Sequence, residues 1–231
     1  LLVYVSAWIK KFHPAAFAAA LLNSQPMGFY APAEIVRCAR DHDVRVLPPD
    51  AAFSDWDCTL ERDGNEILCL RLGLRQIDGF SQGHAELIRE RRQDGYRDFA
   101  DFVRRTGLPR RALVILAEAD ALRGFGLDRR EGLWAVRRLP DDEPLPLFAP
   151  RAAPEQGAET IAPLPLMPLS EHVLADYQTI RLSLKAYPTQ FLRPGFDAEG
   201  IARCKDGGDK HADGEWVRAA GIVLVRQRPG Q

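Results

Sequence analysis

The stretch that most constrains this chain is residues 67–92, ILCLRLGLRQIDGFSQGHAELIRERR. Two short amphipathic runs, Leu70–Ile77 and Ser81–Arg91, flank a tight Asp-Gly-Phe turn centred on Gly79. Gly79 supplies the unhindered backbone that a sharp turn needs, and Ser81 suits the N-cap of a second helix. The pattern I-x-G-F-S-x-x-x-A-x-x-I therefore predicts a helix-hairpin-helix, in which two helices meet at a glycine corner.

The predicted corner has the properties of an anion site. The first amides of a helix lack partners within the helix, and the positive end of the helix dipole favours an anion there. In DNA that anion is a backbone phosphate, which a protein binds without reading the base sequence. Six residues are predicted to contact the DNA backbone: Arg75, Gly79, Ser81, Gln82, Gly83 and His84. The alternative is an ordinary structural corner, which is common in α-proteins.

The distribution of charge favours the phosphate interpretation. The whole chain carries a formal net charge of -1, but residues 71–138 contain fifteen arginines, no lysine and ten acidic residues, a net of +5. Positive or potentially positive residues are predicted to surround the turn: Arg75, His84, Arg89, Arg91 and Arg92. A local positive excess of this kind is what binding to a polyanion requires.

The residues before the hairpin predict short helices and a little β structure. Residues 1–10 suit the end of a buried helix, and Pro14 and Pro32 each suit the first position of a helix. An alternating apolar run at residues 44–47 predicts a short strand, and Asp63-Gly64-Asn65 predicts a β-hairpin turn between two further runs.

A second helix pair follows the first. Residues 109–119 and 128–137 predict helices on either side of a turn at residues 120–126. Asp120 occupies the place where we expect a phosphate-binding glycine, and its carboxylate would repel phosphate. The second unit is therefore predicted to be mainly structural. Two arginines in it remain predicted contacts with the DNA backbone, Arg129 and Arg130.

The composition changes after the second pair. Eight prolines between residues 139 and 169 exclude regular helix or strand over most of that span and predict an extended linker. A helix is predicted over Ser170–Lys185, irregular structure over residues 195–214, and the first strand of an all-β unit over Glu215–Arg228.

Several stretches resemble the bacterial C-family DNA polymerases, the replicative polymerase III alpha subunits. The closing part of that family's fingers domain is similar to KKFHPAAFAAALLNSQPMGFYAPAEIVRCARDHDVRVLPPD at residues 10–50. Its tandem helix-hairpin-helix region is similar to RLGLRQIDGF at residues 71–80 and ADALRGFGLDRREGLW at residues 119–134. The opening strand of its OB-fold domain is similar to GEWVRAAGIVLVRQRPGQ at residues 214–231. The sequences ADA, LPLFAP and SLKAYPTQFLRP are most like the error-prone, damage-inducible subgroup.

The resemblance implies a mainly α fold with small β elements. The implied domains are the end of the fingers at residues 1–66, tandem helix-hairpin-helix at 67–138, a Pro-rich linker at 139–169, a helix and loop at 170–211, and the start of an OB fold at 212–231. The chain begins inside an apolar run without an initiator Met and ends where a predicted strand reaches a turn, so we expect it to be a piece of a longer protein.

The resemblance also implies a fragment of an error-prone DNA-directed DNA polymerase, a nucleotidyltransferase used in DNA replication, DNA repair and translesion synthesis after DNA damage. In that family the palm carries the metal-binding aspartates of two-metal catalysis. This chain matches no palm, so we expect no catalytic residue, metal ligand or cofactor in it, inactivity on its own, and Mg²⁺ only in the parent enzyme. The implied partners are duplex DNA, single-stranded template and translesion accessory proteins. The alternative is a non-catalytic helix-hairpin-helix interaction module.

Two further binding predictions rest on the resemblance. Lys10, Lys11 and His13 are predicted to contact nucleotide or template phosphate, the alternative being a solvated basic turn. Leu145–Phe148 resembles the end of bacterial sliding-clamp-binding peptides, with Pro144 in place of the usual glutamine. The alternative for this segment is a linker hydrophobe that packs on its own domain.

Other candidate sites favour structural roles. Asp55 and Asp57 are predicted to lie in a polar surface loop rather than in a metal site. Cys38 and His42 have metal-compatible i, i+4 spacing, but no second pair lies near them. The four scattered cysteines lack a C-x-x-C pair, which fits a reducing cytoplasm. No apolar run is long enough to predict a membrane span.

Overall fold

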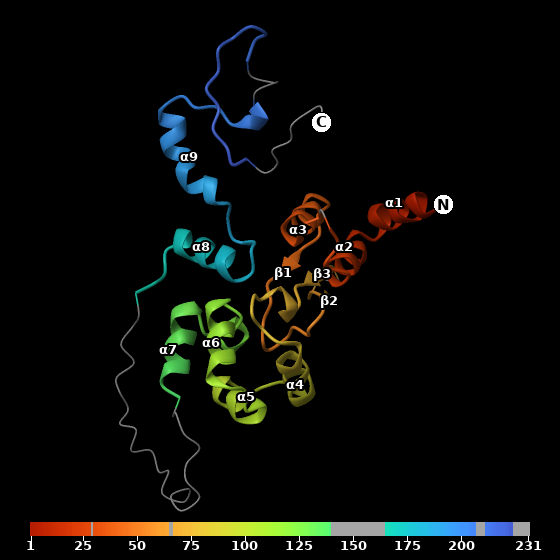
Figure 1. Ribbon diagram of the computed structural model, residues 1–231, viewed down its shortest axis with the longest axis vertical. Helices are drawn as coiled ribbons and strands as arrows, with labels where there is room; N and C mark the ends of the chain where they lie inside the picture. Colours follow the sequence, from red (N-terminus) through yellow and green to blue (C-terminus); the bar gives the residue numbers. More distant parts are fainter. Residues whose placement is uncertain (29, 65–66, 140–164, 207–210, 224–231) are drawn as a thin grey trace, which may run out of the picture. The chain divides into compact units, whose positions relative to one another are not determined.

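The structure is a computed structural model that describes residues 1–28, 30–64, 67–139, 165–206 and 211–223 (Figure 1). The chain forms two compact units. The first comprises Leu1–Met167 together with Ala175–Leu184, and the second comprises Pro168–Leu174 together with Lys185–Gln231. The described residues are mostly helical and include one three-stranded sheet, which confirms the predicted mainly α fold class.

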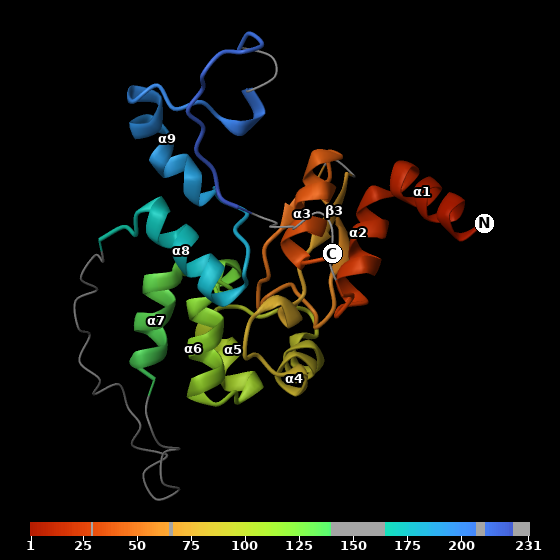
Figure 2. The same ribbon diagram turned by 45° about the horizontal axis from the view of Figure 1, so that its top comes forward.

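Three helices open the first unit: α1 (Leu2–Phe12), α2 (Pro14–Asn23) and α3 (Pro32–Asp41). Proline stands at the first turn of α2 and α3, as predicted, because its missing N–H has no partner there in any case. Figure 2 shows α1 at the edge of the unit, beyond α2. The prediction that residues 1–10 are buried is wrong, since α1 buries no residue in the described structure and Leu1 is fully exposed.

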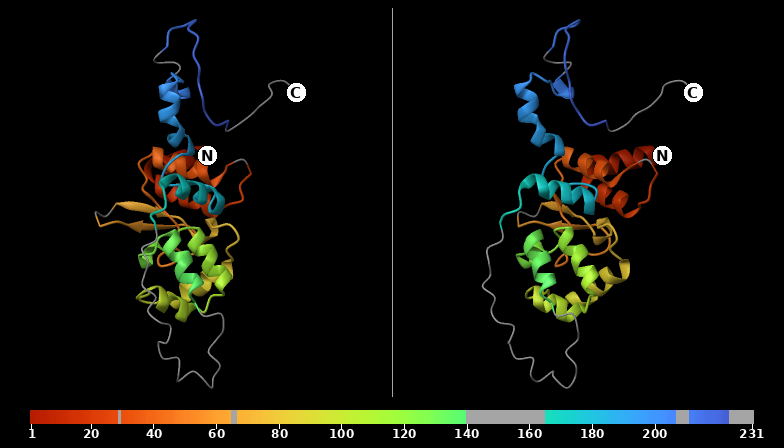
Figure 3. Two further views of the ribbon diagram at one scale, coloured as in Figure 1. Left: turned by 90° about the vertical axis from the view of Figure 1, so that its left-hand side faces the viewer. Right: turned by 60° about the vertical axis from the view of Figure 1, so that its left-hand side comes forward.

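The sheet has the order β1-β3-β2, with β1 (Val46–Leu47) parallel and β2 (Thr59–Arg62) antiparallel to β3 (Leu68–Arg71). The β2–β3 pairing confirms the predicted hairpin around Asp63 and Gly64. In Figure 3 the sheet lies between the red and orange N-terminal helices and the yellow and green helices that follow it.

Four helices form the second half of this unit: α4 (Gln82–Arg92), α5 (Phe99–Thr106), α6 (Arg110–Glu118) and α7 (Arg129–Arg137). Their apolar faces bury a continuous core that includes Phe102, which has no exposed surface. The aromatic rings packed around that side chain are those of Tyr96, Phe99 and Phe125.

The run Leu70–Ile77 is not the helix that its amphipathic pattern predicts. Its first residues belong to β3, and only Leu74–Gln76 forms a short 3-10 helix, η1. The reason is a contact with a distant loop: a Cβ on Gly73 would lie 2.2 Å from the carbonyl oxygen of Trp56. The amides of Leu74 and Arg75 donate to carbonyls of that same loop rather than within a helix.

The C-terminal part differs from its prediction in three places. Helix α8 (Leu169–Thr179) ends before Lys185 because Arg181 has a left-handed backbone with φ +60°. Helix α9 (Pro188–Ala198) is not among the predicted helices, and its last residues lie in the stretch 195–214 that was predicted to be irregular. Described residues 211–223 form no strand, only a bridge between Ala219 and Ala202. Without a neighbouring strand, their N–H and C=O groups lack the partners that strand structure requires.

Candidate nucleic-acid interface

The first corner lies between η1 and α4 and is open to solvent. Gly79 has φ +75°, a conformation in which only glycine is unstrained, and a Cβ at this position would meet no atom closer than Ile115 Cδ1, at 4.0 Å. Phe80 is buried beneath the corner, and its ring lies 5.8 Å from that of His84. The turn is therefore fixed from below while its outer face stays uncovered.

The amides at this corner are the feature on which its chemistry depends. Ser81 caps α4 as predicted, accepting a hydrogen bond from the amide of His84 at 3.3 Å. Within the described part of the chain, the amides of four corner residues donate to no acceptor: Gly79, Ser81, Gln82 and Gly83. All four residues are exposed. Unpaired donors of exposed residues at a helix N-terminus match the hydrogen-bonding needs of a phosphate group.

Arg75, by contrast, is directed inward. Its guanidinium donates to the carbonyl oxygens of Asn23 at 2.7 Å and Gln25 at 2.9 Å, and it pairs with Asp57 at 2.6 Å. These bonds fasten the end of α2 to η1. The geometry therefore favours a structural role for Arg75 over the predicted phosphate contact.

Several other arginines in the basic region are also used internally. Arg92 pairs with Asp55 at 2.9 Å and donates to the carbonyls of Phe53 and Ser54. The carboxylate of Asp101 accepts hydrogen bonds from the guanidinium groups of Arg104 and Arg105. These bonds, above all the one from Arg104, hold the pKa of Asp101 well below its usual range. The net charge of +5 in residues 71–138 therefore overstates the positive charge that is available to a partner. Asp55 and Asp57, which accept some of these bonds, lie in a loop, as predicted.

The second corner repeats the backbone of the first one. Gly126 follows the short 3-10 helix η2 (Arg123–Phe125) with φ +75°, and Asp128 caps α7 two residues later. Gly126, not position 120, is therefore the equivalent of Gly79. Asp120 does have a left-handed backbone with φ +59° directly after the C-cap of α6, as expected where glycine would be favoured, but its side chain is buried and pairs with Arg123 at 2.9 Å.

The amides of the second corner are partly occupied by a capping box. Asp128 accepts from the amide of Glu131 at 2.8 Å, and the carboxylate of Glu131 accepts from the amide of Asp128 at 2.9 Å. Two carboxylates thus stand where the first corner has a serine and open amides. This arrangement supports the prediction of a mainly structural second unit, for a different reason.

The two arginines predicted to contact DNA at the second corner are placed differently. Arg129 is buried, pairs with Asp176 at 2.5 Å and donates to the carbonyl of Glu118 at 2.7 Å, so it faces the protein interior. Arg130 is half-buried and donates to the carbonyl of Pro165 at 2.8 Å. The geometry does not favour Arg129 as a DNA contact and leaves Arg130 at the surface.

A buried carboxylate attaches the second corner to the loop before β2. Asp50 accepts hydrogen bonds from the amides of Ala52 at 2.8 Å and Gly124 at 2.7 Å. Burial raises the pKa of Asp50, and the two amide hydrogen bonds oppose that shift. A Cβ on Gly124 would lie 2.6 Å from this carboxylate, so glycine is required for the close approach.

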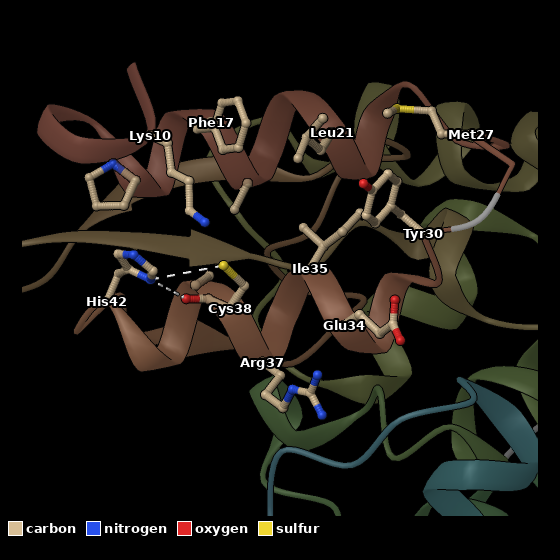
Figure 4. A pocket seen from close by; sticks show the side chains of 13 residues that line it. Lys10, Phe17, Leu21, Met27, Tyr30, Glu34, Ile35, Arg37, Cys38 and His42 are labelled. Atoms are coloured by element: carbon tan, nitrogen blue, oxygen red, sulfur yellow. Dashed lines mark hydrogen bonds between the residues drawn. The ribbon is translucent and has the colours of Figure 1, made fainter. Parts of the chain in front are cut away.

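Of the three basic residues before α2, the structure brings one into a groove. Lys10 lines a groove of about 510 Å³ between α2 and α3, whereas Lys11 and His13 are exposed outside it. Figure 4 shows Lys10 and His42 at one end, Tyr30 and Met27 at the other. The apolar residues between these ends are Phe17, Leu21 and Ile35.

His42, the residue after α3, has its Nδ1 2.7 Å from the carbonyl oxygen of Cys38 in the last turn of that helix. The described residues contain no group of three or more His, Cys, Asp or Glu side chains arranged to hold a metal ion.

No helix in the described ranges has the length and apolarity needed to cross a membrane.

Comparison with known proteins gives this geometry a context. A helix-hairpin-helix motif family matches residues 43–132, which include both corners and the sheet before them. The chain is 57% identical over 229 residues to an error-prone DNA polymerase of Brucella abortus, and 53% identical over 248 residues to one of Rhodopseudomonas palustris. Each match covers 99% of this chain.

The chain is homologous to a segment of the error-prone DNA polymerases. It spans about a fifth of the length of these relatives, 21% of the Brucella abortus protein and 22% of the Rhodopseudomonas palustris protein. The match confirms the polymerase resemblance and the error-prone subgroup. The predicted clamp-binding segment Leu145–Phe148 lies outside the described residues.

One cation beside the first corner was absent from the sequence predictions. Arg181 pairs with Asp78, the residue before Gly79, at 3.0 Å, although 103 positions separate the two in the chain. The amide of Asp78 also donates to the carbonyl of Thr179 at 2.8 Å. No local sequence signal marks this proximity, because it depends on how residues 175–184 pack in the first unit.

Proposed function

We propose that this segment binds the sugar–phosphate backbone of duplex DNA for an error-prone DNA polymerase. The observation that carries the proposal is the set of unpaired, exposed amides at Gly79, Ser81, Gln82 and Gly83. The names of the relatives support it, because a polymerase must hold DNA. Backbone amides form the same hydrogen bonds with every phosphate, so the binding is independent of base sequence.

The proposed role is to hold DNA rather than to carry out chemistry. The family resemblance assigns nucleotidyl transfer and Mg²⁺ to a palm that this segment does not match, so we expect no polymerisation by the segment alone. In the parent enzyme, the proposed context is translesion synthesis and DNA repair in the cytoplasm, with accessory proteins. The same proposal includes two further contacts. An OB fold would bind single-stranded template, and Leu145–Phe148 would bind a sliding clamp.

Lys10 supports a second, smaller contact with nucleic acid. Its ammonium group lines the groove between α2 and α3, where Tyr30 and Phe17 provide ring surfaces. A cation at one end of a groove that also carries aromatic rings suits a phosphate and its attached base. Lys11 and His13, exposed at the same junction, would extend the positive charge along the strand.

The decisive experiment compares the two corner glycines. Gly79→Val should weaken binding to a duplex DNA by at least about tenfold, because a β-branched residue at φ +75° distorts the corner and covers its amides. Affinity is measured by fluorescence anisotropy over a series of salt concentrations, since phosphate binding weakens steeply with salt.

Gly126→Val is the matched control, with the same substitution at the same φ of +75° in the second corner. It should cost similar stability and retain DNA affinity, and circular dichroism checks that both variants keep their helices. An equal loss of affinity in both variants would contradict the proposed site. No DNA binding by the unmodified chain would favour the alternative, a module that docks proteins.

A further inference from the structure

Arg181 occupies a backbone conformation that does not suit it. It follows α8 with φ +60°, in the left-handed region where every residue except glycine meets steric strain. Its neighbours Ile180 and Leu182 are both buried, which fixes the backbone on either side. A residue kept in a strained conformation is a reason to look for a role beyond folding.

The side chain of Arg181 is directed to the first corner. Its guanidinium pairs with Asp78 at 3.0 Å, and the carbonyl of nearby Thr179 accepts from the Asp78 amide at 2.8 Å. Asp78 directly precedes Gly79, so the guanidinium is held beside the open amides. Arg181 is thus held at the first corner by the hydrogen bond between the Asp78 amide and the Thr179 carbonyl and by the ion pair with the Asp78 carboxylate.

The ion pair contributes little to stability. The side chains of Arg181 and Asp78 remain 79% and 58% exposed, and ion pairs in water at this level of exposure are weak. A weak pair does not offset the strain at φ +60°, so folding alone does not account for an arginine here. An exposed guanidinium with five N–H donors is well suited to hold a phosphate oxygen.

We propose that Arg181 is a further phosphate contact of the first corner, acting with the amides of Gly79 and Gln82 on one DNA strand. The inference rests on the proposed function. It supplies at this corner the positive charge that Arg75, fastened to Asn23 and Gln25, does not. Asp78 orients the guanidinium in the free protein, and the weak pair lets it turn to the phosphate.

Arg181→Gly separates the binding role from a folding role. Glycine relieves the strain, so the melting temperature should stay unchanged or rise. Affinity for duplex DNA should fall by about three- to tenfold, and the salt dependence of log Kd should lose about one unit of slope. Arg181→Lys should restore part of the affinity, since it keeps the charge and loses the planar fork.

Arg40→Ala is the control for net charge, because Arg40 is an exposed arginine on α3 that does not lie at the corner. It should leave the salt slope nearly unchanged. The inference is overturned if Arg181→Gly binds DNA with the affinity and slope of Arg40→Ala. If Gly79→Val weakens binding in that case, the proposed function still stands. If Gly79→Val also has no effect, the proposed function fails as well.

Discussion

The two corners of this protein share a backbone and differ in what they present to solvent. Each has a glycine at φ +75° and an extended N-cap residue two positions later. The first N-cap is Ser81, whose hydroxyl takes one amide and leaves its neighbours open. The second is Asp128, which with Glu131 forms a closed capping box and places two carboxylates at the helix start.

The difference shows that a helix N-terminus is not an anion site by geometry alone. The first helical residue differs as well: Gln82 is exposed, whereas Arg129 is buried against Asp176. The cap and the residue after it therefore decide whether the same turn faces a ligand or the protein core. Three sets of variants test this comparison.

The largest expected effect is at the first helical residue of the second corner. Arg129→Ala leaves the carboxylate of Asp176 buried without its counter-ion, so the free energy of unfolding should fall by about 3–5 kcal/mol. Gln82→Ala, at the equivalent position of the first corner, should change it by less than about 0.5 kcal/mol, as is usual at exposed sites. Urea titration followed by circular dichroism measures both, and equal midpoints would contradict the comparison.

An intermediate effect is expected from giving the first corner the cap of the second. Ser81→Asp keeps a good N-cap, so stability should be nearly unchanged. The added carboxylate repels phosphate, and the affinity for duplex DNA should fall by about three- to tenfold at low salt. Ser81→Thr provides the uncharged control. If the aspartate and threonine variants bind DNA alike, the open-amide interpretation of this corner is wrong.

The smallest effect is expected from the reverse change. Asp128→Ser removes a carboxylate but keeps the capping box, because a serine hydroxyl can accept from the amide of Glu131 as well, so the free energy of unfolding should change by less than about 0.5 kcal/mol. DNA affinity should rise by less than about twofold, because the Glu131 carboxylate still repels a phosphate at this corner and the buried Arg129 does not reach one. Thermal melts and anisotropy measure the two quantities. A gain as large as the loss in Ser81→Asp would show that both corners bind DNA.

The sequence predicted the elements whose signals are local. The local signals are the prolines at the starts of α2 and α3, the Ser81 cap and the β2–β3 turn, each of which lies within a few residues of the backbone that it shapes. The first corner was predicted for the same reason, because the glycine, the cap and the buried Phe80 are adjacent in the chain.

The differences between prediction and structure fall where the partner is distant. Gly73 lies between β3 and η1 rather than in a helix because it packs on the backbone of Trp56, a contact that the helical period of its neighbours conceals. An arginine also looks the same in a sequence whether it binds a phosphate or a carbonyl, so the internal bonds of Arg75 and Arg129 had no sequence signal. The equivalence of Gly126 and Gly79 could have been predicted from the sequence, because each glycine stands two residues before the N-cap of the following helix.

The pairing of residues 175–184 with the first unit has a practical consequence for anyone shortening this protein. A version cut in the Pro-rich stretch would keep every hairpin helix, yet it would remove Asp176 from Arg129 and the Thr179 carbonyl from Asp78. Such a truncation would leave a buried guanidinium of α7 without its carboxylate and would loosen the first turn. A minimal version suited to biophysical work therefore extends through Leu184.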